Sequence, residues 1–86
     1  MSWYTYILQC SDSTFYTGIT NNLDKRVIIH NKRKGARYTA RRVPVTLVWY
    51  EVHPDRSNAQ KREIEVKDWR QERKLTLIKN FKTDTS

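Results

Sequence analysis

Two tyrosines, an arginine and a histidine follow one another at short intervals near the start of this 86-residue chain. Tyr6 and Tyr16 are ten residues apart, Arg26 comes ten residues later, and His30 follows after four more. A guanidinium matches the geometry of a phosphate and keeps its charge, while phenol and imidazole groups can position a water molecule or relay a proton. The combination fits a site that cuts phosphodiester bonds.

A hairpin must bring the two tyrosines together. Residues 3–9 and 14–17 are rich in aromatic and β-branched side chains, which is typical of strands. The Ser-Asp-Ser link at residues 11–13 suits a tight connection between them. We therefore expect two antiparallel strands at the start of the chain.

A helix must carry the arginine and the histidine. Asn21 or Asn22 can cap a helix over residues 23–31, in which apolar positions recur on one face. Arg26 and His30 are one turn apart and lie beside that inward face. Neither is expected on the fully solvated side.

The rest of the chain predicts one further strand and two further helices. Ser57 with Gln60 forms a capping box that would open the second long helix. The expected elements are a basic loop (34–44), a strand (45–52), a helix (58–69) and a short C-terminal helix (71–78). The fold class is α+β, a three-stranded antiparallel or mixed sheet with helices packed against it, in ββαβα order plus the last helix. We expect one domain over residues 1–81 and a disordered tail over residues 82–86.

Positive charge is concentrated in the middle of the chain. The net charge is +8, and the segment 25–42 holds eight basic residues and no carboxylate. Such a basic segment favours nucleic acid as the partner. An anionic membrane is less favoured, because the segment has no bulky apolar face. A run of basic residues can also simply keep a protein soluble. Tyr38 within this segment could stack on an unpaired base or pack on the sheet. The candidate nucleic-acid-binding residues are Lys25, Lys32, Arg33, Lys34, Arg37, Tyr38, Arg41 and Arg42.

The compartment is indicated by the cysteine count and the hydropathy. Cys10 is the only cysteine, so no internal disulfide and no Cys/His zinc cluster is expected. No apolar stretch approaches the roughly 18 residues that span a bilayer, and the first residues read as a strand. We expect a cytoplasmic protein without a membrane partner.

With these motifs the chain resembles the GIY-YIG nuclease superfamily, and specifically its small single-domain bacterial branch related to the nuclease subunit of structure-specific endonucleases. Tyr4-Thr5-Tyr6 stands for the first family motif and Tyr16-Thr17-Gly18 for the second. Arg26, His30 and the loop 34–39 then follow in the expected places. The resemblance covers residues 3–78.

The resemblance also implies a glutamate on the second long helix, where Glu63 and Glu65 are both available. At 100° per residue, Glu63 shares the inward face with Ala59, whereas Glu65 faces solvent. The family pattern of a glutamate four residues before a lysine also selects Glu63, which precedes Lys67.

The resemblance implies a role for each of these residues. Glu63 would hold one Mg²⁺ or Mn²⁺ ion, weakly until nucleic acid supplies a phosphate ligand. Arg26 would stabilise charge on the phosphate, and His30 would orient a tyrosine. Tyr6 or Tyr16 would activate the water, although a phenol with its ordinary pKa near 10 is a poor base unless Arg26 or the metal lowers that pKa. All five side chains should converge in one shallow concavity.

The implied function is a divalent-metal-dependent endonuclease that hydrolyses phosphodiester bonds, with branched or otherwise structured DNA as the favoured substrate. The alternative is a non-catalytic module of the same fold that binds DNA or RNA. Taken singly, the tyrosines also read as strand aromatics, and Glu63 with Lys67 reads as an ordinary helical ion pair.

Three departures from the family bear on activity. Tyr4 stands where the first motif often has glycine, Ile19 where some members have lysine, and Asn80 is a doubtful counterpart of their C-terminal asparagine. The missing lysine removes one phosphate contact. These departures predict activity that is weak or that depends on a protein partner supplying substrate specificity.

Overall fold

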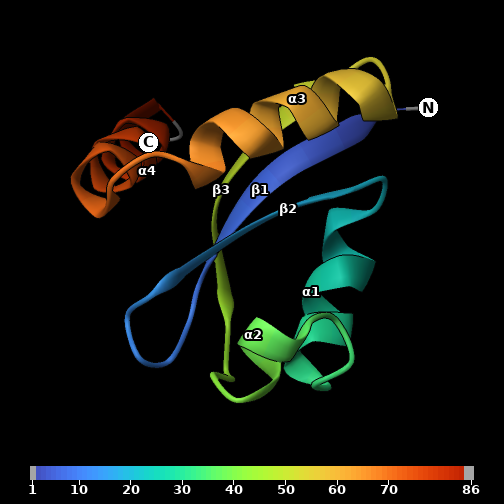
Figure 1. The fold of residues 1–86 in the computed structure, drawn as a ribbon, viewed down its shortest axis with the longest axis vertical. Coiled ribbons are helices and arrows are strands. Elements are labelled where there is room, and N and C mark those ends of the chain that lie inside the picture. The colour runs from blue at the N-terminus through green and yellow to red at the C-terminus, as the bar shows by residue number, and fades with distance from the viewer. Residues whose placement is uncertain (1, 85–86) are drawn as a thin grey trace.

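The fold is an α+β domain, as the sequence predicts. A computed structural model describes residues 2–84, with side-chain surroundings described as far as Phe81. A β-hairpin is followed by two helices, a third strand and two more helices (Figure 1). The elements are β1 (Trp3–Gln9), β2 (Phe15–Thr20), α1 (Leu23–Asn31), α2 (Arg37–Ala40), β3 (Thr46–His53), α3 (Arg56–Lys67) and α4 (Gln71–Asp84).

The sheet is purely antiparallel, which decides between the two predicted arrangements. Its order is β2-β1-β3, so β1 is central and β2 has a neighbour on one side only. Tyr6 of β1 lies opposite Gly18 of β2 and Tyr50 of β3. The register against β3 shifts between Ile7 and Leu8, which marks an irregularity next to the buried centre of β1.

Side chains alternate along β1 and build two separate cores. Ile7 packs in a cluster with Val66 of α3 and Ile78 of α4, whereas Tyr6 and Leu8 belong to a second cluster. Leu23 and Val27 of α1 pack against that second cluster. Because successive strand residues point to opposite faces, α3 and α1 cover opposite faces of the sheet. The Thr5 hydroxyl fixes α3 on its face by donating to the carbonyl oxygen of Ala59 at 2.8 Å.

Several element bounds differ from the prediction. Helix α3 begins at Arg56 and is capped by Asp55, whose carboxylate accepts from the Asn58 amide at 2.8 Å; the predicted Ser57–Gln60 capping box is wrong. The loop 34–44 contains the short helix α2, and the last helix is not short. It runs through Asp84, into the segment 82–86 for which a disordered tail is predicted. Residues 85–86 of that segment lie outside the described residues.

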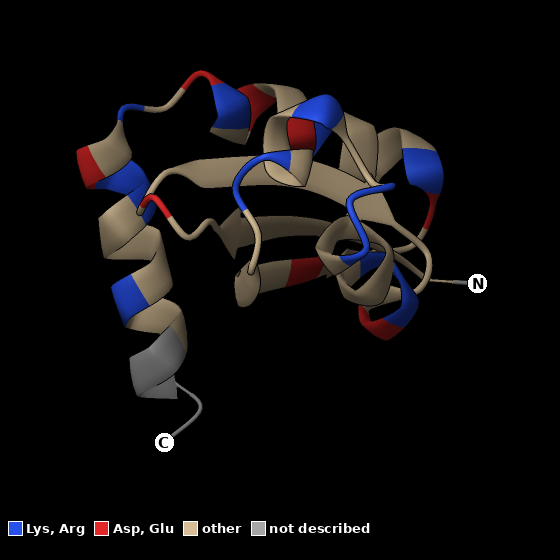
Figure 2. Ribbon diagram, turned by 90° about the horizontal axis from the view of Figure 1, so that it is seen from below, with Lys and Arg blue, Asp and Glu red and all other residues tan. Residues whose placement is uncertain are grey.

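Most of the charged residues lie on the helices and loops (Figure 2). The three strands contain one Asp, Glu, Lys or Arg residue, Glu51 in β3. Between residues 2 and 84, no helix is both long enough and apolar enough to cross a membrane.

Candidate active site

The hairpin places Tyr6 at the centre of the candidate site. Its side chain is only 1% exposed and lies over Gly18 on the neighbouring strand. A Cβ atom at Gly18 would stand 2.5 Å from the Tyr6 hydroxyl oxygen and 2.7 Å from Cζ. Only glycine leaves room for the phenol here, which gives a physical reason for the glycine of the second motif.

A buried chain of hydrogen bonds runs from Tyr6 through His30 to Thr39. The Tyr6 hydroxyl is 2.9 Å from His30 Nε2, and His30 Nδ1 is 2.7 Å from Thr39 Oγ1. Thr39 uses its single proton toward the carbonyl oxygen of Ala36 at 3.2 Å, so it must accept from Nδ1–H. We therefore assign the Nδ1–H tautomer, in which Nε2 accepts the proton of Tyr6.

Thr39 is the functional residue that the sequence argument missed. It is completely buried in α2 and it orients the imidazole that in turn orients Tyr6. The sequence places it in the basic loop without assigning it a partner. The available signal was a single threonine within the basic segment 34–44.

Gly35 holds the arginine and the histidine together. Arg26 Nη2 donates to the Gly35 carbonyl oxygen at 3.0 Å, and a Cβ atom at Gly35 would collide with the His30 ring. The backbone of Gly35 has no positive φ, so close approach to the ring is the reason for glycine. Arg26 Nε is buried and has no hydrogen-bond partner among the described residues.

Burial sets the protonation of this cluster. Burial, assisted by the charge of Arg26, lowers the pKa of His30 to about 4, so the imidazole is neutral at pH 7. Burial also raises the pKa of Tyr6 to about 12, and the opposing hydrogen bond and charge of Arg26 do not overcome it. Arg26 alone therefore does not lower the pKa of Tyr6 below its ordinary value. Tyr6 is a neutral donor, not a base.

The neutral state of His30 makes stability depend on pH. The unfolded chain takes up a proton near the ordinary histidine pKa of about 6.5, whereas the folded protein does so near 4. The stabilisation is therefore complete above pH 6.5 and is lost as the pH falls toward 4, by up to about 3 kcal/mol. Urea unfolding at pH 7.5 and pH 4.5 should show this loss. In His30→Gln the loss over this window should be smaller, and an equal loss would contradict the assignment.

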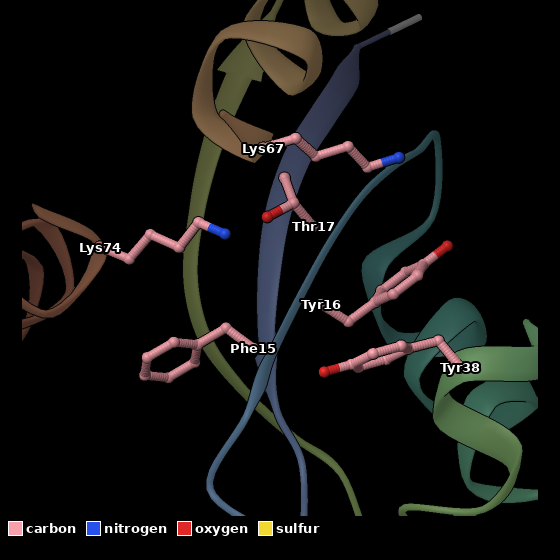
Figure 3. Close-up of a pocket in the computed structure, with 6 residues that line it drawn as sticks. All are labelled: Phe15, Tyr16, Thr17, Tyr38, Lys67 and Lys74. Carbon is pink, nitrogen blue, oxygen red and sulfur yellow. The ribbon is translucent and has the colours of Figure 1, made fainter. Parts of the chain in front are cut away.

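Tyr16 lies at the surface of the same cluster. Its ring centroid is 5.2 Å from that of His30 and 6.1 Å from that of Tyr38, on which it stacks. It lines a pocket of about 320 Å³, shown in Figure 3. Since Tyr6 is buried and Tyr16 is not, only Tyr16 can contact a substrate without a rearrangement.

Glu63 lies on the inward side of α3, as helical phase predicts. Its side chain is 18% exposed, while that of Glu65 is 55% exposed and bonded to Arg62 at 2.6 Å. The Glu63 charge is close enough to Tyr6 to raise the pKa of that phenol slightly. Its ion pair with Lys67 is long, at 3.6 Å.

The donor set at Glu63 fits a loosely held hard cation. Among the described residues, no three His, Cys, Asp or Glu side chains gather where they could hold a metal. One carboxylate oxygen pair suits Mg²⁺, which commonly keeps several waters and takes phosphate oxygens as further ligands. Glu63 is the residue that would hold it.

Two of the five predicted side chains, Tyr16 and Arg26, line different pockets. Tyr6 and His30 are buried with the half-buried Arg26 beside them, and Tyr16 packs on the surface of this cluster. Arg26 lines a different pocket, of about 200 Å³, at the start of α1. The charges of Arg26, Tyr16 and Glu63 all act on Tyr6, so these residues lie near one another, and convergence of all five in one shallow concavity stays a prediction.

The predicted nucleic-acid-binding residues fall into two groups. Arg42 and Tyr38 already have partners within the fold: Arg42 binds Asp12 at 3.0 Å, donates to the Tyr38 carbonyl oxygen at 2.7 Å and lies 4.0 Å from the Tyr38 ring centroid. Tyr38 also stacks on Tyr16. The others are exposed on α1, on α2 and beside them; they are Lys25, Lys32, Arg33, Lys34, Arg37 and Arg41.

Comparison with known proteins agrees with this geometry. A family model described as the GIY-YIG catalytic domain matches residues 2–76. The UPF0213 protein DP2720 of Desulfotalea psychrophila is 52% identical over 91% of this chain and 72% of its own length. The UPF0213 protein CPE1444 of Clostridium perfringens is 48% identical over 87% of this chain and 81% of its own length.

Two solved structures have the same fold. The solution NMR structure of the UPF0213 protein BH0048 from Bacillus halodurans aligns with a TM-score of 0.58 and 39% identity, covering 92% of this chain and 84% of its own. The NMR structure of EF2693 from E. faecalis aligns with a TM-score of 0.63 and 34% identity, covering 96% and 88%. The names of these relatives state no activity. With its family match over residues 2–76 and its relatives at 34% to 52% identity, the chain belongs to the GIY-YIG family.

Proposed function

We propose that this protein is a divalent-metal-dependent endonuclease that hydrolyses phosphodiester bonds in branched or otherwise structured DNA. Membership of the GIY-YIG catalytic-domain family supports a nuclease-type function. The observation that carries the proposal is the buried Tyr6–His30–Thr39 chain with Arg26 beside it. Burying three polar side chains beside a half-buried arginine costs free energy, and an apolar core would give the same stability without them.

Each residue has a task that its surroundings allow. Arg26 stabilises charge on the phosphate, and Tyr16, at the pocket surface, positions the attacking water. Tyr6 holds its place by donating to His30, which Thr39 keeps in the required tautomer. When bound at Glu63, a divalent cation supplies Lewis acidity toward the phosphate oxygens.

The tyrosines can be told apart by single substitutions. Tyr16→Phe should lower cleavage by about 100-fold or more, the range for loss of a positioned proton-transfer group, without weakening DNA binding. Tyr6→Phe should lower it less and should cost about 1 kcal/mol of stability through the lost buried hydrogen bond. The assay uses labelled branched, single-stranded and duplex DNA with Mg²⁺, Mn²⁺ or chelator. Full activity in Tyr16→Phe would show that Tyr16 has no role in positioning the water.

The second candidate is a non-catalytic nucleic-acid-binding module. The Glu63–Lys67 ion pair favours it, because the lysine neutralises the carboxylate without a metal. This candidate predicts salt-sensitive binding to DNA or RNA with no cleavage in any of the metal conditions. A protein partner that supplies substrate specificity is compatible with either candidate function. Adding the partner would raise DNA cleavage only if the protein is an endonuclease.

A further inference from the structure

The pocket that Tyr16 lines, at the open edge of the sheet, extends to Thr17, Lys67 and Lys74, which have no task in the proposed mechanism. It has a volume of about 320 Å³ and wraps around β2. Side chains from β2, α2, α3 and α4 meet there (Figure 3). They are Phe15, Tyr16, Thr17, Tyr38, Lys67 and Lys74.

The charge of the pocket lining is entirely positive. Lys67 ends α3 and Lys74 lies in the first turns of α4, and no carboxylate lines the pocket with them. Within residues 2–81, Lys74 has no carboxylate partner, and Lys67 has only the long contact with Glu63. Burial and the neighbouring charge of Lys67 lower the pKa of Lys74. Two ammonium groups that repel each other in a half-buried pocket suit an anion.

Thr17 supplies an independent sign of a ligand. It is only 3% exposed, and its hydroxyl is buried with no hydrogen-bond partner among the described residues. Figure 3 shows this hydroxyl turned toward the Lys74 side of the pocket. An unsatisfied buried hydroxyl costs about 1 to 3 kcal/mol, so a missing acceptor is the simplest explanation.

The remaining walls are aromatic. Phe15 and Tyr38 line this pocket and also a neighbouring one of about 220 Å³, which Lys74 shares. Nucleobases stack on such rings. A volume of about 320 Å³ is at the lower end of the range for small-ligand pockets, which suits one nucleotide-sized group.

We propose that this pocket binds a phosphate group of the nucleic-acid strand next to the one that is cut, through Lys67, Lys74 and the Thr17 hydroxyl. The nucleotide attached to that phosphate packs on Phe15 or Tyr38. The identification of the bound anion as a phosphate of a nucleic-acid strand rests on the proposed function. The anion site itself is inferred from the residues that line the pocket. Because Tyr16 lines the same pocket, the bound strand passes directly from this subsite to the candidate active site.

The charge contribution is tested by salt dependence. Binding of a labelled single-stranded oligonucleotide is measured in chelator at several salt concentrations for the full chain, Lys74→Gln, Lys74→Arg and Lys61→Gln. Lys61 is exposed on α3 and outside the pocket, so its loss is a matched control for charge. Lys74→Gln should reduce the slope of log K against log salt by about 0.7, and Lys74→Arg should restore it. An unchanged slope in Lys74→Gln, or an equal change in Lys61→Gln, overturns the proposal.

The hydroxyl contribution is tested by Thr17→Val. Removing an unsatisfied hydroxyl should leave thermal stability equal or higher, while the oligonucleotide binds more weakly at an unchanged salt slope. A more stable variant that binds as well as the parent chain overturns the role of Thr17. Inorganic phosphate is titrated in parallel. If Lys74→Gln weakens phosphate binding but leaves the salt dependence of oligonucleotide binding unchanged, the pocket binds free phosphate. That result would overturn its assignment to a nucleic-acid strand.

These results are independent of catalysis because the binding is measured without metal. A reduced slope in Lys74→Gln together with no cleavage by the parent chain in Mg²⁺ or Mn²⁺ would keep the subsite and reject the nuclease. Normal cleavage and normal binding in Lys74→Gln would keep the nuclease and reject the subsite.

Discussion

Glu63→Gln should lower metal-dependent DNA cleavage by about a thousand-fold or more, while DNA binding in chelator stays equal or becomes slightly tighter. Glutamine keeps the shape of the side chain but removes the carboxylate proposed to hold the cation. A metal ion contributes several kcal/mol to phosphoryl-transfer chemistry, and about 1.4 kcal/mol corresponds to a factor of ten. Initial rates with Mg²⁺ and Mn²⁺ measure the loss.

Glu65→Gln is the matched control. It removes the same charge two residues away, where the side chain is solvent-facing and paired with Arg62. Cleavage in this variant should stay within about twofold of the parent rate, since an exposed ion pair contributes little. Unaltered cleavage in Glu63→Gln would point to a contaminating nuclease or to a different metal ligand. Equal losses in both variants would show that net charge, not metal binding, governs the rate.

Gly18→Ala should disrupt both stability and cleavage. The added methyl group would stand 2.5 Å from the Tyr6 hydroxyl oxygen, and the ring it meets is buried and bonded to His30. Overpacking of this kind costs about 1 to 3 kcal/mol, measurable by urea unfolding. Displacing the ring by about 1 Å should lower cleavage by about 100-fold.

A double variant separates this contact from a general effect on the strand. Tyr6→Phe removes the nearest atom, so Gly18→Ala should cost less in that background, with a coupling of about 0.5 kcal/mol or more. Additive effects would mean that Gly18 is not needed to accommodate the Tyr6 hydroxyl.

The sequence predicts elements whose signals are local. Helix α1 has the predicted bounds because Asn22 caps it, accepting from the Lys25 amide, and its apolar residues repeat regularly. The inward placement of Glu63 follows from helical period alone. For α3, two good caps compete within three residues, and Asp55 prevails because its carboxylate reaches the Asn58 amide.

The site depends on contacts that sequence spacing does not encode. Thr39 meets His30 only because the chain turns back at Gly35, and that path is set by packing of α2 on α1. Whether Arg26 can lower the pKa of Tyr6 depends on how deeply the phenol is buried, and burial is the largest cause of the raised pKa. Depth of burial is a property of the assembled fold.

The two edges of the sheet are protected in different ways. At β3, the terminal helix packs alongside, with Phe81 against Tyr50 at a ring-centroid distance of 5.2 Å. At β2, the strand has no neighbour on its outer side, and Lys67 and Lys74 flank it. Lysine beside an open strand discourages edge-to-edge pairing, because a second copy of the chain would bring the same charges against it. The lysines that suit an incoming DNA strand thus also oppose aggregation through β2.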